Sequence, residues 1–117
     1  MISEARYAAI SSALLRDKRV SRREGRGFGS SGLWANGKLF ALRSSKGEFV
    51  VKLPRARVDA LVASRVGKQF DPGHGRLMKE WLAISTGTES RLLALAREAL
   101  DYAGVSASAR TARRPTR

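Results

Sequence analysis

The chain has 117 residues and carries 23 lysine and arginine residues against 10 aspartate and glutamate residues, a formal net charge of +13 at pH 7. This length predicts one domain with a single hydrophobic core. The lack of cysteine excludes disulfides, thiolate metal sites and cysteine nucleophiles, and one histidine excludes a histidine-rich metal site, so we expect no metal and no cofactor.

The N-terminus shows an amphipathic pattern with an early acid, Glu4, and not the pattern of a secretory signal. The sequence contains no run of 18 apolar residues, so we expect no transmembrane helix. We therefore expect a cytoplasmic protein without a membrane partner.

The excess of positive charge concerns the binding partners of the protein and not its fold. Arginine supplies 17 of the 23 cations. Nucleic acid is the first candidate partner, before an acidic protein or an anionic membrane. The alternative is that an arginine-rich composition reflects a genome-wide bias and that the charges form a solvated surface.

The first predicted element is a helix over roughly residues 3–17. Ser3 is a suitable N-cap, and Tyr7, Ile10 and Leu14 recur at the spacing of a buried helical stripe. Residues 16–26 follow with six cations and two acids, the densest basic segment of the expected domain. Part of this segment, about residues 20–24, is a candidate first strand. A strand would divide the cations between two faces, so phosphate binding and a solvated loop remain equal alternatives.

Residues 27–53 predict three antiparallel strands. The glycine-rich stretch 27–32 lacks a P-loop lysine and is interpreted as a bent strand entrance. Asn36-Gly37 predicts a two-residue type I′ turn, and Ser44–Gly47 predicts a four-residue turn. The two loop lengths predict these opposite pairs: Leu33 with Phe40, Trp34 with Leu39, Arg43 with Glu48, Leu42 with Phe49, and Phe40 with Val51.

The predicted register assigns each side chain to one face of the sheet, because side chains alternate along a strand. The expected core face consists of Leu33, Phe40, Leu42, Phe49, Val51 and Leu53. The expected mixed face consists of Trp34, Leu39, Ala41, Arg43, Glu48, Val50 and Lys52. On that face, Arg43 and Glu48 are expected to form a cross-strand ion pair.

A second helix is predicted to begin at Pro54, with Val58, Leu61 and Val62 inward and Gly67 as its stop. Arg55 and Arg57 fall in its first turn, where the helix dipole disfavours cations. Such a placement is tolerated if these arginines face an anion or a carboxylate such as Asp59. We take it as a hint of an anionic ligand.

Residues 68–76 predict a loop that turns at Asp71-Pro72-Gly73. His74 in this loop has no candidate nucleophile beside it in the sequence, so we expect local hydrogen bonding and not catalysis. Residues 77–84 predict a strand with Trp81 as a core or edge anchor.

The last helix is predicted to start at a Thr86–Glu89 capping box and to end near Ala103, with Gly104 as its stop. Residues 105–117 contain four arginines and no acid, which predicts a disordered basic tail after a single domain of residues 1–104.

With these elements in place, the chain resembles the YjbR/MmcQ-like family, which is related to the N-terminal domain of the competence regulator TfoX. The resemblance covers about residues 5–103. The segments that carry it, in the order of the family, are Phe28-Gly29-Ser30, residues 37–41, residues 50–54, residues 70–76 and Met78-Lys79-Glu80-Trp81. Two positions depart from the family pattern: Gly27 stands where a methionine is usual, and Leu77 stands where a proline is usual.

The resemblance implies an α+β fold of the YjbR-like or secretion-chaperone-like type, an antiparallel β-sheet with about three helices packed on it. Family members are commonly described as DNA-binding, with the sheet hairpins pictured as wings. The resemblance implies no catalytic residue and no cofactor.

The leading hypothesis is a non-enzymatic, regulatory domain that binds double-stranded nucleic acid, DNA in the first place, mainly through phosphates. The predicted contact residues are Arg22, Arg23, Arg26, the hairpin-tip Lys46, Arg55 and Arg57, with Lys38 and Lys52 as second choices. The alternative hypothesis is a protein-interaction module that uses the mixed sheet face around Trp34, Leu39 and Val50. An enzyme has little support, because the sequence shows no paired carboxylates at a suggestive spacing and no nucleophile with a base.

Overall fold

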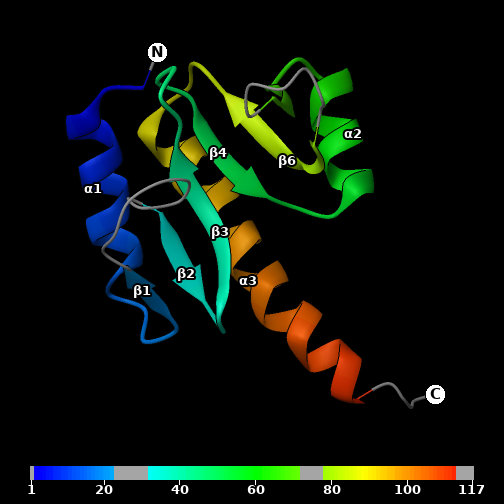
Figure 1. Cartoon of the computed structure of the whole chain (residues 1–117). Helices are drawn as coiled ribbons and strands as arrows, with labels where there is room; N and C mark the ends of the chain where they lie inside the picture. The colour runs from blue at the N-terminus through cyan, green and yellow to red at the C-terminus, as the bar shows by residue number, and fades with distance from the viewer. Residues whose placement is uncertain (1, 23–31, 72–77, 113–117) are drawn as a thin grey trace.

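The computed structural model describes residues 2–22, 32–71 and 78–112, with side chains as far as Gly104. Its elements are, in chain order, α1 (Glu4–Leu14), β1 (Val20–Arg22), β2 (Leu33–Ala35), β3 (Lys38–Arg43), β4 (Phe49–Lys52), α2 (Arg55–Ala63), β5 (Lys68–Phe70), β6 (Met78–Ile84) and α3 (Glu89–Ala112) (Figure 1). The six strands form one sheet in the order β1-β2-β3-β4-β6-β5, with every neighbouring pair antiparallel. The prediction of an α+β fold with an antiparallel sheet and three helices is confirmed for this part of the chain.

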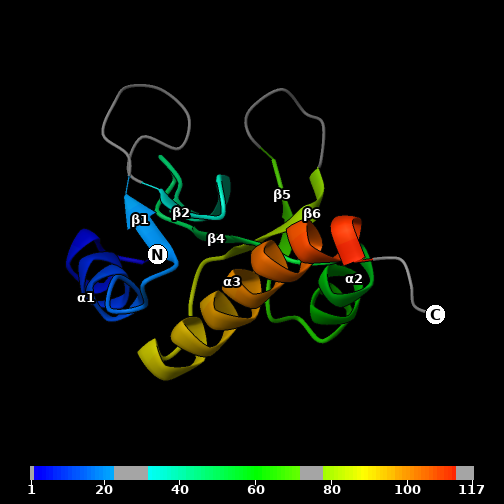
Figure 2. The ribbon, with the colours of Figure 1, turned by 90° about the horizontal axis from the view of Figure 1, so that it is seen from below.

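The three helices lie on the same side of the sheet, as Figure 2 shows. Their buried side chains join one face of the sheet in the main hydrophobic cluster. Phe40, Phe49 and Leu82 from the strands and Leu92 from α3 are all fully buried there. Burial of such large apolar side chains is the dominant favourable term in folding. This cluster therefore fixes where the helices sit on the sheet.

A second apolar cluster lies on the opposite side of the sheet and draws only on strands. It consists of Leu42, Val50, Phe70, Trp81 and Ala83, with the half-buried Leu39 and Met78 packed against it. The expected role of Trp81 as a core anchor is confirmed, because the residue is 8% exposed.

The first helix begins as predicted but ends at Leu14, three residues before the predicted end. Ser3 is the N-cap, and its side chain accepts a hydrogen bond from the Arg6 backbone N–H at 3.1 Å. Tyr7, Ile10 and Leu14 are buried against the sheet, as their spacing predicted. The Tyr7 ring lies 6.0 Å from that of Phe49 and packs α1 onto β4. Residues 20–22 of the predicted first strand are confirmed as β1, and its last two predicted residues lie outside the described residues.

The β2–β3 hairpin confirms the predicted turn and corrects part of the register. Asn36 and Gly37 both have positive φ, 57° and 76°, as a type I′ turn requires. Trp34 pairs with Leu39 as expected, but Leu33 pairs with Ala41 and not with Phe40. A β-bulge causes this change, because it sets two residues of β3 opposite one of β2. Phe40 and Ala41 consequently both belong to the main cluster.

The predicted register of β3 against β4 is wrong by one residue. Leu42 pairs with Val50 and Arg43 with Phe49. The Ser44 N–H donates to the Glu48 carbonyl at 2.9 Å, so the loop is the three-residue Ser45–Gly47. Gly47 has φ 78°, the left-handed conformation that closes a loop of this length. A slip of one residue moves side chains to the other face. Leu42 therefore lies in the second cluster, whereas Ala41 joins the main one.

The expected Arg43–Glu48 pair does not form. The Arg43 Nε donates to the backbone carbonyl of Ile2 at 2.8 Å, and its Nη1 lies 3.9 Å from a carboxylate oxygen of Glu4. Glu48 is buried, where its Oε1 accepts from the Ser44 hydroxyl at 3.2 Å and its Oε2 lies 3.7 Å from Lys68 Nζ. The register shift separates the two residues that the predicted four-residue loop had placed opposite each other.

The end of α2 differs from its prediction. The helix ends at Ala63, and Arg65, not Gly67, takes the left-handed position with φ 63°. The Val66 N–H donates to the Leu61 carbonyl at 2.9 Å, which makes this a Schellman-type end. Gly67 serves another purpose, because a Cβ at this position would lie 2.6 Å from the Ala83 backbone oxygen.

The chain passes from Gly67 directly into β5. This strand pairs with β6, so the prediction of a loop over the whole of residues 68–76 is wrong for its first three positions. A three-residue edge strand with one buried side chain, Phe70, carries no detectable alternation. The turn residues Pro72 and Gly73 and the loop histidine His74 lie outside the described residues.

The boundaries of α3 are also corrected at both ends. Its cap is Thr88, whose Oγ1 accepts from the Arg91 backbone N–H at 3.1 Å, and not Thr86. The helix continues through Gly104 to Ala112, so Gly104 is not its stop. Glycine is only a weak helix breaker, costing about 1 kcal/mol relative to alanine. Residues 27–31 of the glycine-rich stretch and residues 113–117 of the expected tail lie outside the described residues. Residues 105–112 of the expected disordered tail belong to α3. The rest of the division into a domain and a tail stays a prediction.

Candidate nucleic-acid interface

The predicted contact residues do not gather in one place. Arg22 ends β1 and Lys46 lies in the β3–β4 loop, both toward the same end of the sheet. Arg55 and Arg57 begin α2, which follows the opposite end of β4. Arg23 and Arg26 lie outside the described residues. A single patch formed by the four described residues is therefore not present.

Arg57 forms an intramolecular ion pair. Its Nε and Nη2 donate to the two carboxylate oxygens of Glu98 on α3, each at 2.9 Å. These hydrogen bonds raise the pKa of Arg57. The carboxylate that offsets the unfavourable position at the start of α2 is therefore Glu98, not the suggested Asp59. Arg55, beside it, is exposed and makes no ion pair with a described carboxylate.

The second-choice lysines lie at the other end of β3 and β4 from Lys46. Lys52 Nζ is 4.0 Å from Glu80 Oε1 and 5.9 Å from the centre of the Trp81 ring, within range of a cation–π contact. Lys38 is half-buried at the start of β3. Lys52 is engaged by Glu80 and Trp81, and Lys38 is half-buried. Both lysines are therefore less accessible to a phosphate than a fully exposed cation.

Three exposed cations lie along the α1–β1 unit, at one edge of the sheet: two in the connection after α1 and one at the end of β1. They are Arg16, Lys18 and Arg22, which we call the basic edge. No carboxylate of the described residues forms an ion pair with any of the three. Their charges are thus available to a partner, in contrast to the charge of Arg57. Both Arg16 and Lys18 belong to the segment that the sequence marks as most basic.

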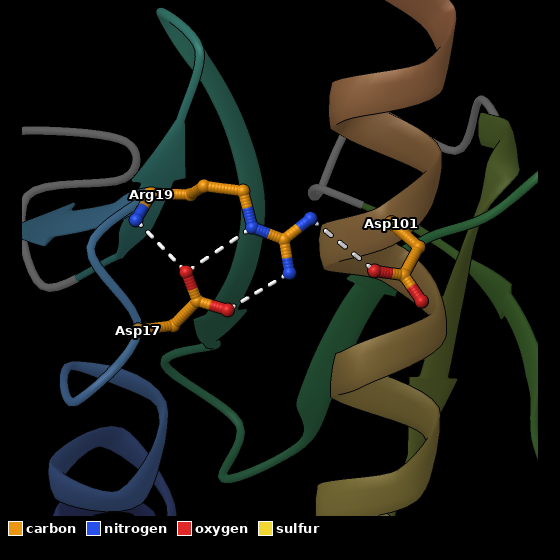
Figure 3. Close-up of polar contacts among 3 residues, drawn as sticks. All are labelled: Asp17, Arg19 and Asp101. Carbon is orange, nitrogen blue, oxygen red and sulfur yellow. Dashed lines mark hydrogen bonds and ion pairs between the residues drawn. The ribbon is translucent and has the colours of Figure 1, made fainter.

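The connection that carries the basic edge is held by Arg19 (Figure 3). Its Nη2 lies 2.8 Å from Asp17 Oδ2 and its Nε 3.1 Å from Asp17 Oδ1, and its Nη1 reaches Asp101 Oδ1 on α3 at 3.4 Å. The hydrogen bonds from the Arg19 side chain and backbone N–H lower the pKa of Asp17 to about 2, and those to the two aspartates raise the pKa of Arg19. Arg19 therefore ties the connection to α3 and orients its neighbours.

A groove of about 330 Å³ opens between the end of α1, this connection and α3, and we call it the α1–α3 groove. Its lining residues are Ala13, Leu14, Arg16, Asp17, Arg19, Arg97, Leu100 and Asp101. Arg97 is exposed on α3 and makes no ion pair with a described residue. The groove therefore adjoins the basic edge through Arg16 and adds a further unneutralised arginine to it.

Sequence reasoning missed Arg97. The residue lies on the last helix, in a stretch interpreted only for its apolar stripe. Its exposure follows from the helical period, but nothing in the sequence shows that residue 97 lies near residue 16. Arg16 and Lys18, in contrast, could have been selected from the sequence, because they lie in its densest basic segment.

The mixed sheet face of the alternative hypothesis is less open than expected. Val50 is fully buried in the second cluster, and Trp34 and Leu39 are half-buried. Val50 therefore cannot contact a partner without rearrangement of that cluster. The protein-interaction hypothesis itself stays a prediction.

Neither a metal cluster nor a membrane span is found within residues 2–22, 32–71 and 78–112. No three histidine, cysteine or acidic residues among them are grouped to hold an ion, and no helix there has the length and apolarity to cross a bilayer. Comparisons of the chain with known protein families, with characterised proteins and with solved structures find no match. The resemblance to the YjbR/MmcQ-like family therefore stays a prediction.

Proposed function

We propose that the protein binds nucleic acid, DNA in the first place, through backbone phosphates and that the basic edge is its principal contact surface. The observation that carries this proposal is the exposure of Arg16, Lys18 and Arg22 on one unit of the fold without a carboxylate partner among the described residues. The net charge of +13 supports it, because a charge of this size attracts polyanions over the whole surface.

The chemistry of the basic edge suits phosphate better than bases. Guanidinium and ammonium groups bind phosphate oxygens strongly and release condensed counterions from the nucleic acid. Reading of base edges needs a helix or ribbon that enters a groove of the duplex. The basic edge is a short connection followed by a three-residue strand. We therefore propose binding that depends on backbone geometry and charge, without a catalytic step.

The test compares two triple variants of the full chain that lose the same charge. In one, Arg16, Lys18 and Arg22 are each replaced by glutamine. In the control, the exposed cations Arg65, Lys79 and Arg91 are each replaced by glutamine, which lie beside α2, on β6 and on α3. Binding to a labelled random duplex is measured between about 50 and 200 mM salt, where log K should fall by about 0.9 per log unit of salt for each phosphate neutralised.

The basic-edge variant should lose most of the affinity and about two to three phosphate contacts from the salt slope. The control variant should lose clearly less. Equal losses would reduce the interaction to net charge, and binding by the wild type that does not depend on salt would contradict the proposal. A third variant, with Arg110, Arg113, Arg114 and Arg117 each replaced by glutamine, should retain binding. Complete loss in that variant would assign binding to the arginines near the C-terminus instead.

A further inference from the structure

The α1–α3 groove brings together arginines that are about 80 residues apart in sequence. Arg16 reaches it from the end of α1 and Arg97 from α3, and Arg19 lies between the two elements. The buried Leu14 and Leu100 form the apolar part of its wall. The groove thus combines an apolar surface with guanidinium groups from two separate elements.

The charges of the groove leave room for one anion. Three arginines and two aspartates line it, which gives a net charge of +1. Both aspartates bind Arg19, whereas Arg16 and Arg97 have no carboxylate partner among the described residues. A phosphodiester carries one negative charge and therefore matches this balance better than a doubly charged phosphate monoester.

We infer that the α1–α3 groove receives one phosphodiester of the bound strand, contacted by Arg16 and Arg97, with the attached sugar against the half-buried Ala13. The inference rests on the proposed function and extends it from the basic edge to α3. A groove of about 330 Å³ is large enough for one sugar–phosphate unit, since small-ligand sites begin at about 300 Å³. Arg19 is a positioning residue, because its donors already face Asp17 and Asp101.

The position of α3 makes the groove a rigid site. The helix is anchored in the main cluster by Leu92, Ala96 and Leu100, and Arg19 joins it to the connection at Asp101. A contact between rigid elements loses little conformational entropy on binding. Arg97 should contribute more to affinity than an arginine elsewhere on the same rigid helix, because it alone lines the groove.

The first arm of the test removes one positive charge from α3 at either of two places in the full chain. Arg97→Gln removes the charge in the groove. Arg91→Gln removes an exposed charge that has no carboxylate partner in the described part of the chain, about 9 Å away along the axis and about 120° around it. With the random duplex at about 50 mM salt, Arg97→Gln should weaken binding about five-fold and lower the salt slope by about 0.9, whereas Arg91→Gln should change binding less than two-fold.

The second arm removes one negative charge from the same helix. Asp101→Asn should strengthen binding at least about two-fold, because it raises the net charge of the groove above +1. Glu89→Gln is the matched control, exposed about 18 Å away along α3 and without an ion pair to a described residue. It should leave affinity nearly unchanged. Circular dichroism of the four variants establishes that each is folded.

The outcomes separate the two proposals. Absence of salt-dependent binding by the wild type would overturn both of them. Binding by the wild type with equal effects within either pair of folded variants would overturn the groove assignment alone. Unequal effects in both pairs, in the stated directions, would establish the groove as a phosphate site.

Discussion

The α1–β1 unit and the α2–β5 unit are built alike and differ in the interactions that hold the connection between helix and strand. Each consists of a helix, a short connection and a three-residue strand at an edge of the sheet, β1 at one edge and β5 at the other (Figures 1 and 2). In α1–β1 the connection is tied by the side chains of Asp17, Arg19 and Asp101. In α2–β5 it is shaped by the backbone at Arg65 and Gly67.

This difference explains why the two units offer different surfaces. In the first connection, exposed ion pairs add to backbone hydrogen bonds from Asp17 N–H to Leu14 O and from Val20 N–H to Asp17 O, so part of its stabilisation is screened by salt. This connection presents Arg16 and Lys18 to solvent. The second connection depends on a left-handed residue and on a close approach of backbone to β6, and neither involves charge. A functional surface that responds to ionic strength is therefore expected at α1–β1 and not at α2–β5.

The largest effect on stability should come from disturbing the close backbone approach between the α2–β5 connection and β6. Gly67→Ala places a Cβ 2.6 Å from the Ala83 carbonyl oxygen, a backbone atom that cannot move without disturbing β6. We expect a loss of about 1–3 kcal/mol in the free energy of unfolding, as for overpacking elsewhere. Urea unfolding measures it, with Ser64→Ala at the exposed helix end as control. A change equal to that of the control would show that the approach of the two segments is not restrictive.

A substitution at Arg65 in the same connection should instead stabilise the protein. Its φ of 63° is unfavourable for a residue with a Cβ, so Arg65→Gly should raise the free energy of unfolding by about 0.5–1 kcal/mol. Ser64→Gly is the matched control, because Ser64 has φ −85° and gains nothing from glycine. Thermal unfolding in parallel would compare them. Destabilisation by both glycines would mean that the left-handed conformation carries no appreciable cost.

Both units reach α3 through an ion pair, and the α2 pair should be the stronger. Arg57 and Glu98 form two hydrogen bonds of 2.9 Å, whereas Arg19 and Asp101 meet once at 3.4 Å. About 40% of each side chain of the α2 pair is exposed, so a double-mutant cycle with Arg57→Gln and Glu98→Gln should give a coupling of only about 0.5 kcal/mol. The cycle at Arg19 and Asp101 should give less, and a larger value there would reverse the ranking.

The smallest effect concerns the Asp17–Arg19 ion pair in the α1–β1 connection and depends on pH. The pKa of Asp17 is lowered from 3.8 to about 2, so its ion pair stabilises the fold above about pH 4 and loses that effect as the pH falls through about 2. The difference in melting temperature between the wild type and Asp17→Asn should therefore shrink from pH 4 to pH 2. Asp59→Asn, at an exposed position of α2, is the control. A constant difference over this range would contradict the assigned pKa.

The sequence by itself determined the elements with strong local signals. The Asn36-Gly37 turn, the Ser3 cap and the apolar stripe of α1 each follow from interactions within a few residues. Such signals define where chains turn and which helix face is apolar. They were sufficient for the α+β class and for most of the core. They also marked residues 16–26 as the most basic segment, to which the basic edge belongs.

Tertiary structure decided the features that depend on contacts between distant segments. The bulge at Phe40 and the three-residue β3–β4 loop shift the register, because long-range packing of Phe40, Phe49 and Val51 on the helices outweighs the simplest loop count. Strand β5 exists only through its pairing with β6. Arg57 and Glu98 are 41 residues apart, so their pairing could not be foreseen from local spacing.

The candidate site shows the same limit most clearly. Charge density along the chain identified Arg16 and Lys18 as belonging to a basic segment, but it could not include Arg97. The α1–α3 groove forms because Leu14 and Leu100 pack in one hydrophobic cluster and bring two distant helices together. Local sequence fixes which residues are charged, whereas burial of apolar surface decides which charges become neighbours.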